Sequence, residues 1–178
     1  VDKVAAWALL SRLYLNAPVY IGSDMSSQVI ANAEKVISSS YSLNTSDGNG
    51  NGSAYDELFL ADNNTNGAQN EFIFVVQFDG LNSQTWGGGT FMVHAPIGGS
   101  MDPSIFGVNG GWGGLRTTKA LVDKFEYSIT ASNGDGHPIA WSDSRAMFHT
   151  DGQNYEMEKV APFKEGYGVT KFRNVDIT

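Results

Sequence analysis

Two tryptophans in this sequence lie beside runs of glycine. Trp86 is followed by three glycines, and Trp112 lies between two pairs of glycines, residues 110–111 and 113–114. Glycine offers no side chain to pack against, so small neighbours leave an indole face uncovered. Such a face suits a flat ligand, because the apolar C–H face of a sugar ring stacks on an indole. The other interpretation is that either indole folds back under its loop as a hydrophobic plug.

Polar side chains near the two tryptophans could bind sugar hydroxyls. The candidates are Asn82, Gln84, Asn109 and Arg116, although Arg116 fits better as an anchor where the loop becomes a helix. If a stack buries about 60 Å² of apolar surface, it contributes ~1.5 kcal/mol. Two stacks with hydrogen bonds predict roughly micromolar to millimolar affinity after the entropy cost of association.

Carboxylates are numerous enough to raise the alternative of a glycoside hydrolase. Such an enzyme needs one carboxylic acid with a raised pKa and one ionised partner at a fixed separation. Asp79, Asp102 and Asp143 are the candidate acids. Glu156 and Glu158 would share one face of an expected strand, where solvated acids are the simpler interpretation. Spacing along the chain shows neither the pKa nor the separation.

Metal-binding patterns in the sequence are incomplete. Asp47, Asn49 and Asn51 imitate the start of a calcium-binding loop, but Leu58 stands where the bidentate glutamate belongs, so a flexible loop is favoured. Asp62 lies among oxygen-bearing neighbours and could bind calcium or form Asx turns, of which the turns are favoured. The three histidines lie far apart and match no zinc pattern.

Composition excludes several classes of function. The chain has 178 residues, which is enough for one domain with a core of its own. Its formal charge of -8 argues against nucleic acid or an anionic membrane surface as a partner. It has no cysteine, which excludes disulfides and thiolate chemistry. No leader segment and no apolar run near the ~18 residues of a membrane span is evident, so we expect a soluble chain.

Two helices are predicted near the start of the chain. Residues 4–16 are strong helix formers that end at Pro18, and residues 24–39 repeat apolar side chains at one-sided helical spacing. Such an antiparallel pair has the length of one tetratricopeptide repeat. Because no second copy follows and one repeat cannot bury both its faces, the pair looks like a piece of a longer helical protein.

The middle of the chain is predicted to be rich in loops. Residues 44–54 are turn formers, and Ser53 with Asp56 matches a capping box before a short helix. Residues 71–78 are β-branched and aromatic, which predicts a covered strand. Residues 80–114 otherwise have little regular structure, and a loop of that length is usually functional.

Short elements are predicted within and after that long loop. Residues 90–94 resemble a strand, and residues 118–125 form a helix of about two turns. Residues 139–149, 155–160 and 167–173 follow as strands or extended segments separated by glycines.

Five segments, taken in order, resemble the SusD/RagB family. They are AAWALLSRLYLNA, EFIFVVQFDG, WGGLRTTKALVDKF, DSR at residues 143–145, and GYGVTKFRN. Each is weak alone, but together they extend over essentially the whole chain. The family consists of lipid-anchored outer-membrane glycan-binding proteins.

The resemblance implies a mainly α fold. It would be a fragment of an α-α superhelix, with a tetratricopeptide-like helix pair, long irregular loops and a few short strands. Residues 1–178 would form a single domain from the central and C-terminal part of a longer protein. Its parts would be a helix pair (1–40), a loop-rich glycan-binding region with a strand (41–116), and a helix with short strands (117–178).

The resemblance also implies binding without catalysis. The match looks closest to the starch-binding member, so the implied ligand is starch or another α-glucan, taken up by a TonB-dependent transporter of the SusC type. Trp112 matches an aromatic residue of the family's binding arc, and Trp86 falls near another. Asp62 lies near a calcium position, and calcium is the one cofactor implied. The implied location is the outer-membrane surface, through a lipid anchor outside this chain.

A further alternative is that this piece mainly contacts the transporter. The exposed face of the helix pair around Arg12 or Gln28 would then be the functional surface.

Overall fold

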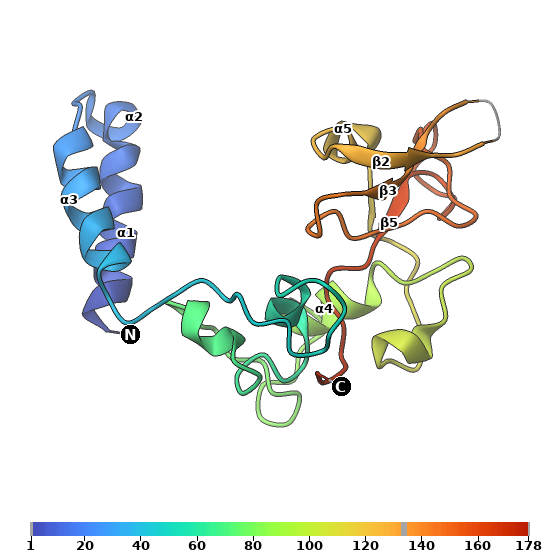
Figure 1. The fold of residues 1–178 in the computed structure, drawn as a ribbon, viewed down its shortest axis with the longest axis horizontal. Coiled ribbons are helices and arrows are strands. Elements are labelled where there is room, and N and C mark those ends of the chain that lie inside the picture. Colours follow the sequence, from blue (N-terminus) through green and yellow to red (C-terminus); the bar gives the residue numbers. More distant parts are fainter. Residues whose placement is uncertain (1, 133–134, 178) are drawn as a thin grey trace.

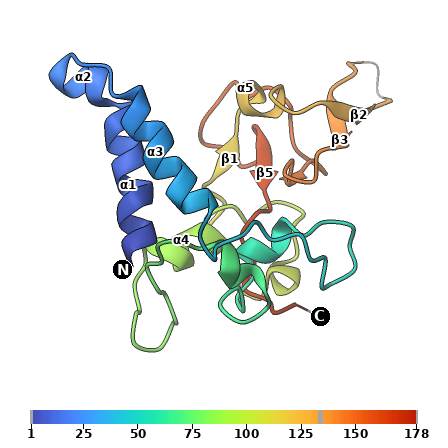
Figure 2. The same cartoon turned by 60° about the vertical axis from the view of Figure 1, so that its left-hand side comes forward.

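The first elements of the structure are three helices (Figure 1). The computed structural model describes residues 2–132 and 135–177. Its N-terminal helices are α1 (Lys3–Leu15), α2 (Ala17–Ile21) and α3 (Ser26–Ile37). Asp2 caps α1, because its carboxylate accepts a hydrogen bond from Ala5 N at 2.9 Å. α1 and α3 pack side by side (Figure 2), so the two predicted helices are confirmed.

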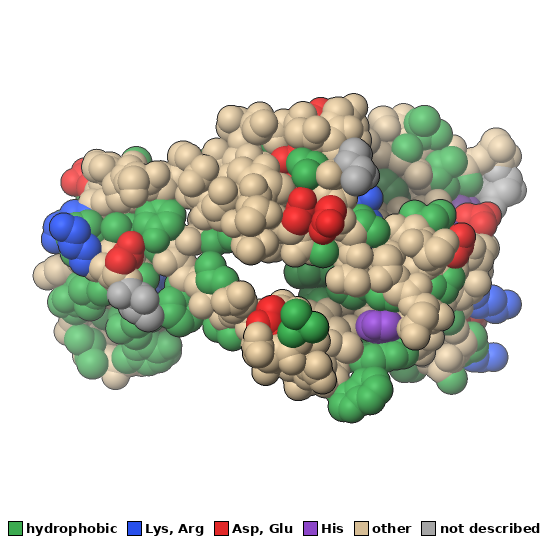
Figure 3. Space-filling model, turned by 90° about the horizontal axis from the view of Figure 1, so that it is seen from below, with side chains coloured by type: hydrophobic (Ala, Val, Ile, Leu, Met, Phe, Trp, Pro, Cys, Tyr) green, Lys and Arg blue, Asp and Glu red, His purple; other side chains and the backbone are tan. Residues whose placement is uncertain are grey.

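The helix pair exposes much of its apolar surface. Figure 3 shows hydrophobic side chains gathered on this part of the molecule, at the left of the view. Leu15, Val19 and Ile37 are among the exposed side chains. Among the described residues, no helix is long and apolar enough to cross a lipid bilayer.

The predicted mainly α superhelix is wrong. Only 30% of the chain is helical and 10% is strand, and its two small sheets are antiparallel, counted over the residues that the structure describes. The sequence after α3 is rich in asparagine, serine and glycine. Their side chains or their backbone freedom favour turns over helix, so the chain turns irregular after the first helix pair. The division of residues 1–178 into three parts of one domain stays a prediction.

The strand predicted for residues 71–78 does not form. Its first residue ends the 3-10 helix η2 (Ala68–Glu71), and the rest runs irregularly without joining either sheet. Phe74 and Val76 are exposed. β-branched residues favour an extended backbone, but a strand also needs a partner edge, and the local sequence does not supply one.

The strand predicted for residues 90–94 is a helix instead. It is α4 (Gly88–His94), and it turns Val93 toward the hydrophobic core. A further 3-10 helix, η3 (Pro103–Phe106), begins where the Asp102 carboxylate accepts a hydrogen bond from Ser104 N at 2.9 Å. The core cluster that α4 and η3 share consists of Ile97, Met101 and Phe106, with Val93, Val108 and Phe163 packed against them.

The C-terminal half contains two small sheets and a short helix. Its elements are β1 (Arg116–Thr117), α5 (Lys119–Val122), β2 (Tyr127–Thr130), β3 (Pro138–Trp141), β4 (Phe148–His149) and β5 (Tyr167–Val169). One antiparallel sheet has the order β1-β5-β4, with Arg116 opposite Gly168, and the other pairs β2 with β3. Tyr167 is fully buried and donates its hydroxyl to Pro138 O at 2.7 Å, which joins the two sheets.

Two predictions for this half need correction. The helix predicted over residues 118–125 is only the single turn of α5, whose one buried residue is Val122. Residues 155–160 form no strand, so Glu156 and Glu158 do not share a strand face. Glu156 instead forms an ion pair with Lys119 at the surface.

Candidate functional site

The two glycine-flanked tryptophans come together in space. The ring centroids of Trp86 and Trp112 lie 6.2 Å apart, and their planes are inclined by 44°. Trp86 is 82% exposed and Trp112 is 42% exposed. Both indoles therefore present ring surface to solvent from neighbouring positions, although they come from opposite ends of the long loop.

The backbone around Trp112 is held against the end of α4. Trp112 N donates to His94 O at 2.9 Å, and Gly113 N donates to Ile97 O at 2.9 Å. A Cβ added to Gly111 would lie 2.1 Å from Ile97 O. Glycine is thus required at position 111 because two backbone segments touch there, in addition to leaving the indole uncovered.

A histidine covers one face of Trp112. The His94 ring stacks on the indole with centroids 5.3 Å apart and planes inclined by 17°. His94 Nδ1 lies 2.8 Å from Gly110 O, which fixes the ring by a hydrogen bond. The ring centroid of Phe91, one helical turn earlier, lies 6.2 Å from that of the same indole. Histidine spacing along the chain does not predict this contact. The i, i+3 spacing of Phe91 and His94 becomes informative only once residues 88–94 are known to be helical.

Replacing His94 with alanine is expected to lower the free energy of unfolding by about 1 kcal/mol, as loss of one aromatic pair does. It should also shift tryptophan emission to longer wavelength, because Trp112 becomes more solvated. His94→Phe keeps a ring in place and should leave the emission near that of the unchanged protein. Thermal unfolding and emission spectra measure both effects. The same emission shift in a Trp112→Phe background would contradict the assignment to Trp112.

The side chains of the predicted polar candidates are tied to neighbouring groups to different degrees. Asn82 donates its side-chain amide to Asp79 Oδ2 at 3.0 Å, and Gln84 donates to Leu81 O at 3.1 Å. Both side chains are exposed, as is Asn109. Their role as sugar ligands stays a prediction.

Arg116 is an anchor, as predicted, but it lies in strand β1 and not where the loop becomes a helix. Its Nε donates to Glu165 O at 3.0 Å, and its Nη2 donates to Pro162 O at 3.3 Å. The guanidinium also lies over the Phe163 ring, 5.6 Å from the centroid. These contacts tie the end of the tryptophan loop to residues 160–165.

A comparison with known proteins finds a relative named for starch binding. No protein-family model matches the chain. Starch-binding protein SusD of Bacteroides thetaiotaomicron is 38% identical to it over 125 residues, which is 70% of this chain and 21% of SusD. The predicted similarity to SusD is confirmed. The similarity covers 70% of the chain, whereas the resemblance was expected to extend over essentially all of it. The chain spans about a fifth of the length of SusD.

SusD is named for binding starch. The alternative, a glycoside hydrolase, depends on the pKa values of the candidate acids. The Asp79 carboxylate accepts hydrogen bonds from Ser83 N at 3.0 Å and from Asn82, which hold its pKa below the ordinary value. The hydrogen bond from Ser104 N lowers the pKa of Asp102 in the same way.

Asp143, the third candidate acid, is also held ionised. Arg145 Nη2 donates to Asp143 Oδ2 at 2.6 Å, and hydrogen bonding from Arg145 lowers the pKa of Asp143 to about 2. A general acid for glycoside hydrolysis needs a raised pKa. The pKa values of all three candidate acids are shifted the opposite way, so none of them fits the role of the general acid.

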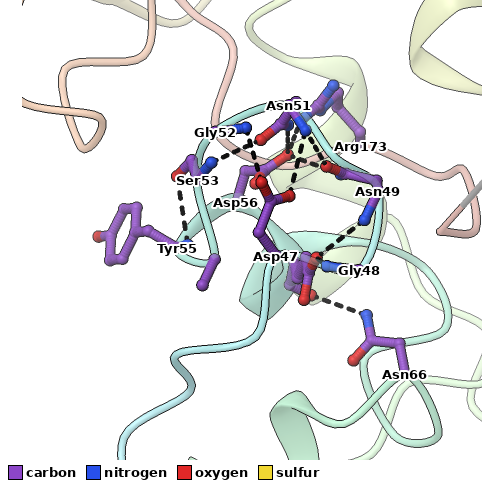
Figure 4. A network of polar contacts seen from close by, with 12 residues as sticks. Asp47, Gly48, Asn49, Asn51, Gly52, Ser53, Tyr55, Asp56, Asn66 and Arg173 are labelled. Atoms are coloured by element: carbon purple, nitrogen blue, oxygen red, sulfur yellow. Dashed lines mark hydrogen bonds and ion pairs between the residues drawn. The ribbon is translucent and has the colours of Figure 1, made fainter.

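The calcium-like loop before the tryptophans is ordered by its own hydrogen bonds (Figure 4). Asp47 accepts from Asn51 N at 3.1 Å and from Gly52 N at 2.8 Å, so both carboxylate oxygens bind the loop backbone. Asn51 Nδ2 donates inward to Asp56 Oδ2 at 2.7 Å. The loop predicted to be flexible is therefore built around a buried acid.

Two buried acids of η1 (Asp56–Phe59) organise that loop. Asp56 is 2% exposed and Glu57 is fully buried. Arg173 Nη2 donates to Asp56 Oδ2 at 2.7 Å, which ties η1 to the C-terminal segment. Glu57 Oε1 accepts from the amides of Gly48 and Asn49. The capping-box pattern of Ser53 and Asp56 does not predict this role, although two adjacent acids among apolar residues are a signal of buried, paired carboxylates.

Asp62 lies in an Asx-rich turn beside the same region. Its Oδ1 accepts from Asn66 Nδ2 at 3.2 Å, and its Oδ2 accepts from Ile177 N at 3.0 Å. No group of three acidic or histidine side chains in the described part of the chain is arranged to hold a metal ion. Calcium at Asp62 stays a prediction.

Proposed function

We propose that this chain binds a neutral glycan of the starch type, an α-glucan, and does not cleave it. The observation that carries the proposal is the exposed pair Trp86 and Trp112, with ring centroids 6.2 Å apart. Similarity to a protein named for starch binding supports the same ligand class. The depressed pKa values of the candidate acids support binding without hydrolysis.

The angle between the indoles favours a curved glycan chain over a flat one. Planes inclined by 44° turn their faces in different directions. Successive rings of an α-1,4-glucan also turn relative to one another, whereas a β-1,4-glucan is a flat ribbon. Two neighbouring rings of an α-glucan can thus each meet one indole. With ~1.5 kcal/mol from each stack, binding is weak for one short oligosaccharide and stronger for a polymer that engages many copies.

Trp112→Ala and Trp86→Ala are each expected to weaken maltoheptaose binding about tenfold, because one lost stack costs ~1.5 kcal/mol and 1.4 kcal/mol is a factor of ten. Isothermal titration calorimetry measures the change. Trp7→Ala is a matched control, since Trp7 lies in α1 and should leave the affinity unchanged. Unchanged affinity in both loop variants would exclude this surface as the binding site.

Incubation with starch separates this proposal from the hydrolase alternative. We expect no release of reducing sugar, because no candidate acid has the raised pKa that protonates a leaving group. Release of reducing sugar that is lost in Asp79→Asn or Asp143→Asn would establish the hydrolase instead.

We further propose a location at the outer-membrane surface and delivery of the glycan to a TonB-dependent transporter of the SusC type. The resemblance to the family supports this, and the exposed helix pair offers a contact surface around Arg12 and Gln28. Co-purification with such a transporter, lost on Arg12→Glu while maltoheptaose binding persists, would identify the helix pair as the contact.

Calcium at Asp62 is a separate proposal. A calcium ion would have to replace the hydrogen bonds that Asp62 accepts from Asn66 and from Ile177 N. If it binds, millimolar calcium should raise the melting temperature, and Asp62→Asn should remove that rise.

A further inference from the structure

A pocket lies on the side of the chain formed by α5, β4 and β5. Its volume is about 420 Å³, which lies within the range of small-molecule sites. Tyr55, at the start of η1, closes one side of it. The pocket shares no lining residue with the tryptophan pair.

Three cationic side chains line this pocket. They are Lys124, Arg145 and Lys171, and no acidic side chain is among the lining residues that the structure describes. The whole chain has 19 acidic residues against 11 lysines and arginines. The charged side chains that line the pocket are therefore all cationic, which is the reverse of the overall charge, and such a lining attracts an anionic group.

The cationic groups keep donors for a ligand. Lys171 Nζ donates to Tyr55 OH at 2.6 Å and lies 4.2 Å from the centroid of the Phe59 ring, which holds the ammonium in place. An ammonium has three donors, so that hydrogen bond uses only one of them. Arg145 donates to Asp143 through Nε and Nη2, and its Nη1 takes no part in these two hydrogen bonds.

The remaining walls are apolar. Phe125 and Phe148 meet edge to face with centroids 5.6 Å apart, and Leu121, Met147 and Val169 complete the lining. Such walls match the C–H face of a pyranose, while the cations match an anionic substituent on the same ring.

We propose that this pocket binds an anionic sugar unit, a pyranose that carries a carboxylate or a sulfate ester. This goes beyond the neutral glycan surface of Trp86 and Trp112, and it does not depend on that surface. The ligand's anionic group lies among the three cations, and its ring lies against the phenylalanines.

The test is a titration of the isotope-labelled chain with D-glucuronate, glucose 6-sulfate, glucose and inorganic sulfate, followed by amide NMR signals. We expect one or both anionic sugars to shift the signals of residues 121–125 and 145–148, with a dissociation constant on the order of millimolar. Lys124→Glu should weaken this binding roughly tenfold, because it reverses a charge beside the ligand. Binding of glucuronate alone identifies a carboxylate as the group that the pocket recognises, and binding of glucose 6-sulfate alone identifies a sulfate ester.

Lys159→Glu is the matched control, since Lys159 is an exposed lysine outside the pocket. Glucuronate binding should be unchanged in Lys159→Glu, and it should also be unchanged in Trp112→Ala. Equal weakening by Lys124→Glu and Lys159→Glu would overturn the proposal, because the effect would then be one of net charge. Glucose shifting the same signals, inorganic sulfate binding as tightly as both sugars, or no binding of either anionic sugar would overturn it as well.

Discussion

Asp56→Ala is expected to lower the free energy of unfolding by about 3 kcal/mol. The substitution leaves the Arg173 guanidinium without the carboxylate that it meets at 2.7 Å. It also removes the acceptor of Asn51 Nδ2, so the loop of residues 47–53 loses its inward hydrogen bond. Asp56 is 2% exposed, so water cannot replace these contacts without opening the site. Urea unfolding followed by circular dichroism measures the loss.

Two variants separate the buried ion pair from the loop's own hydrogen bonds. Asp56→Asn keeps the shape and an acceptor for Arg173, so we expect it to cost less than the alanine variant. Asp47 lies on the same loop but is exposed, and Asp47→Ala should cost about 1 kcal/mol or less. If Asp56→Ala and Asp47→Ala lower the free energy of unfolding equally, the buried acid contributes no more to stability than the exposed one, which would contradict this account.

Gly111→Ala is expected to have the second large effect. The added Cβ would lie 2.1 Å from Ile97 O, a distance that forces the two backbone segments apart. The hydrogen bonds of Trp112 N to His94 O and of Gly113 N to Ile97 O then weaken or break. We expect a loss of about 3 kcal/mol in unfolding free energy, at the upper end of overpacking effects. Displacement of the indole should also weaken maltoheptaose binding.

The neighbouring glycine is a close control. A Cβ added to Gly110 would meet nothing within 4 Å, so Gly110→Ala should change stability by less than about 0.5 kcal/mol. Unfolding curves and tryptophan emission of the two variants can be compared directly. If Gly110→Ala and Gly111→Ala behave alike, the close backbone approach at residue 111 is not what requires glycine.

The two N-terminal helices could be predicted because their signals are local. The apolar spacing of residues 24–39 and the helix formers of residues 4–16 lie within the elements themselves. Residues 71–78 show where this fails, because a strand depends on a partner edge elsewhere in the chain. Residues 90–94 fail for a related reason. Four of the five are apolar or β-branched, which fits a strand or one helical turn, and tertiary packing of Val93 decides between the two.

The candidate site was accessible to sequence reasoning only in part. Glycines flanking Trp86 and Trp112 mark the loops, but no local pattern shows that the two indoles lie within 6.2 Å. The stacking of His94 on Trp112 requires the fold of residues 94–115. Likewise, the partner of Asp56 is Arg173, 117 positions away, so the burial of that acid could not be derived from its neighbours.

The most direct measurement of the central claim is an NMR titration of the four indole N–H signals with maltoheptaose. Trp86 and Trp112 should shift together with one dissociation constant, because their ring centroids lie 6.2 Å apart and both indoles are proposed to contact the same ligand. Trp7 in α1 and Trp141 in β3 should not shift, and they serve as internal controls. Unmoved signals of Trp86 and Trp112 at about 10 mM maltoheptaose, well above the expected dissociation constant, would contradict the proposed glycan surface.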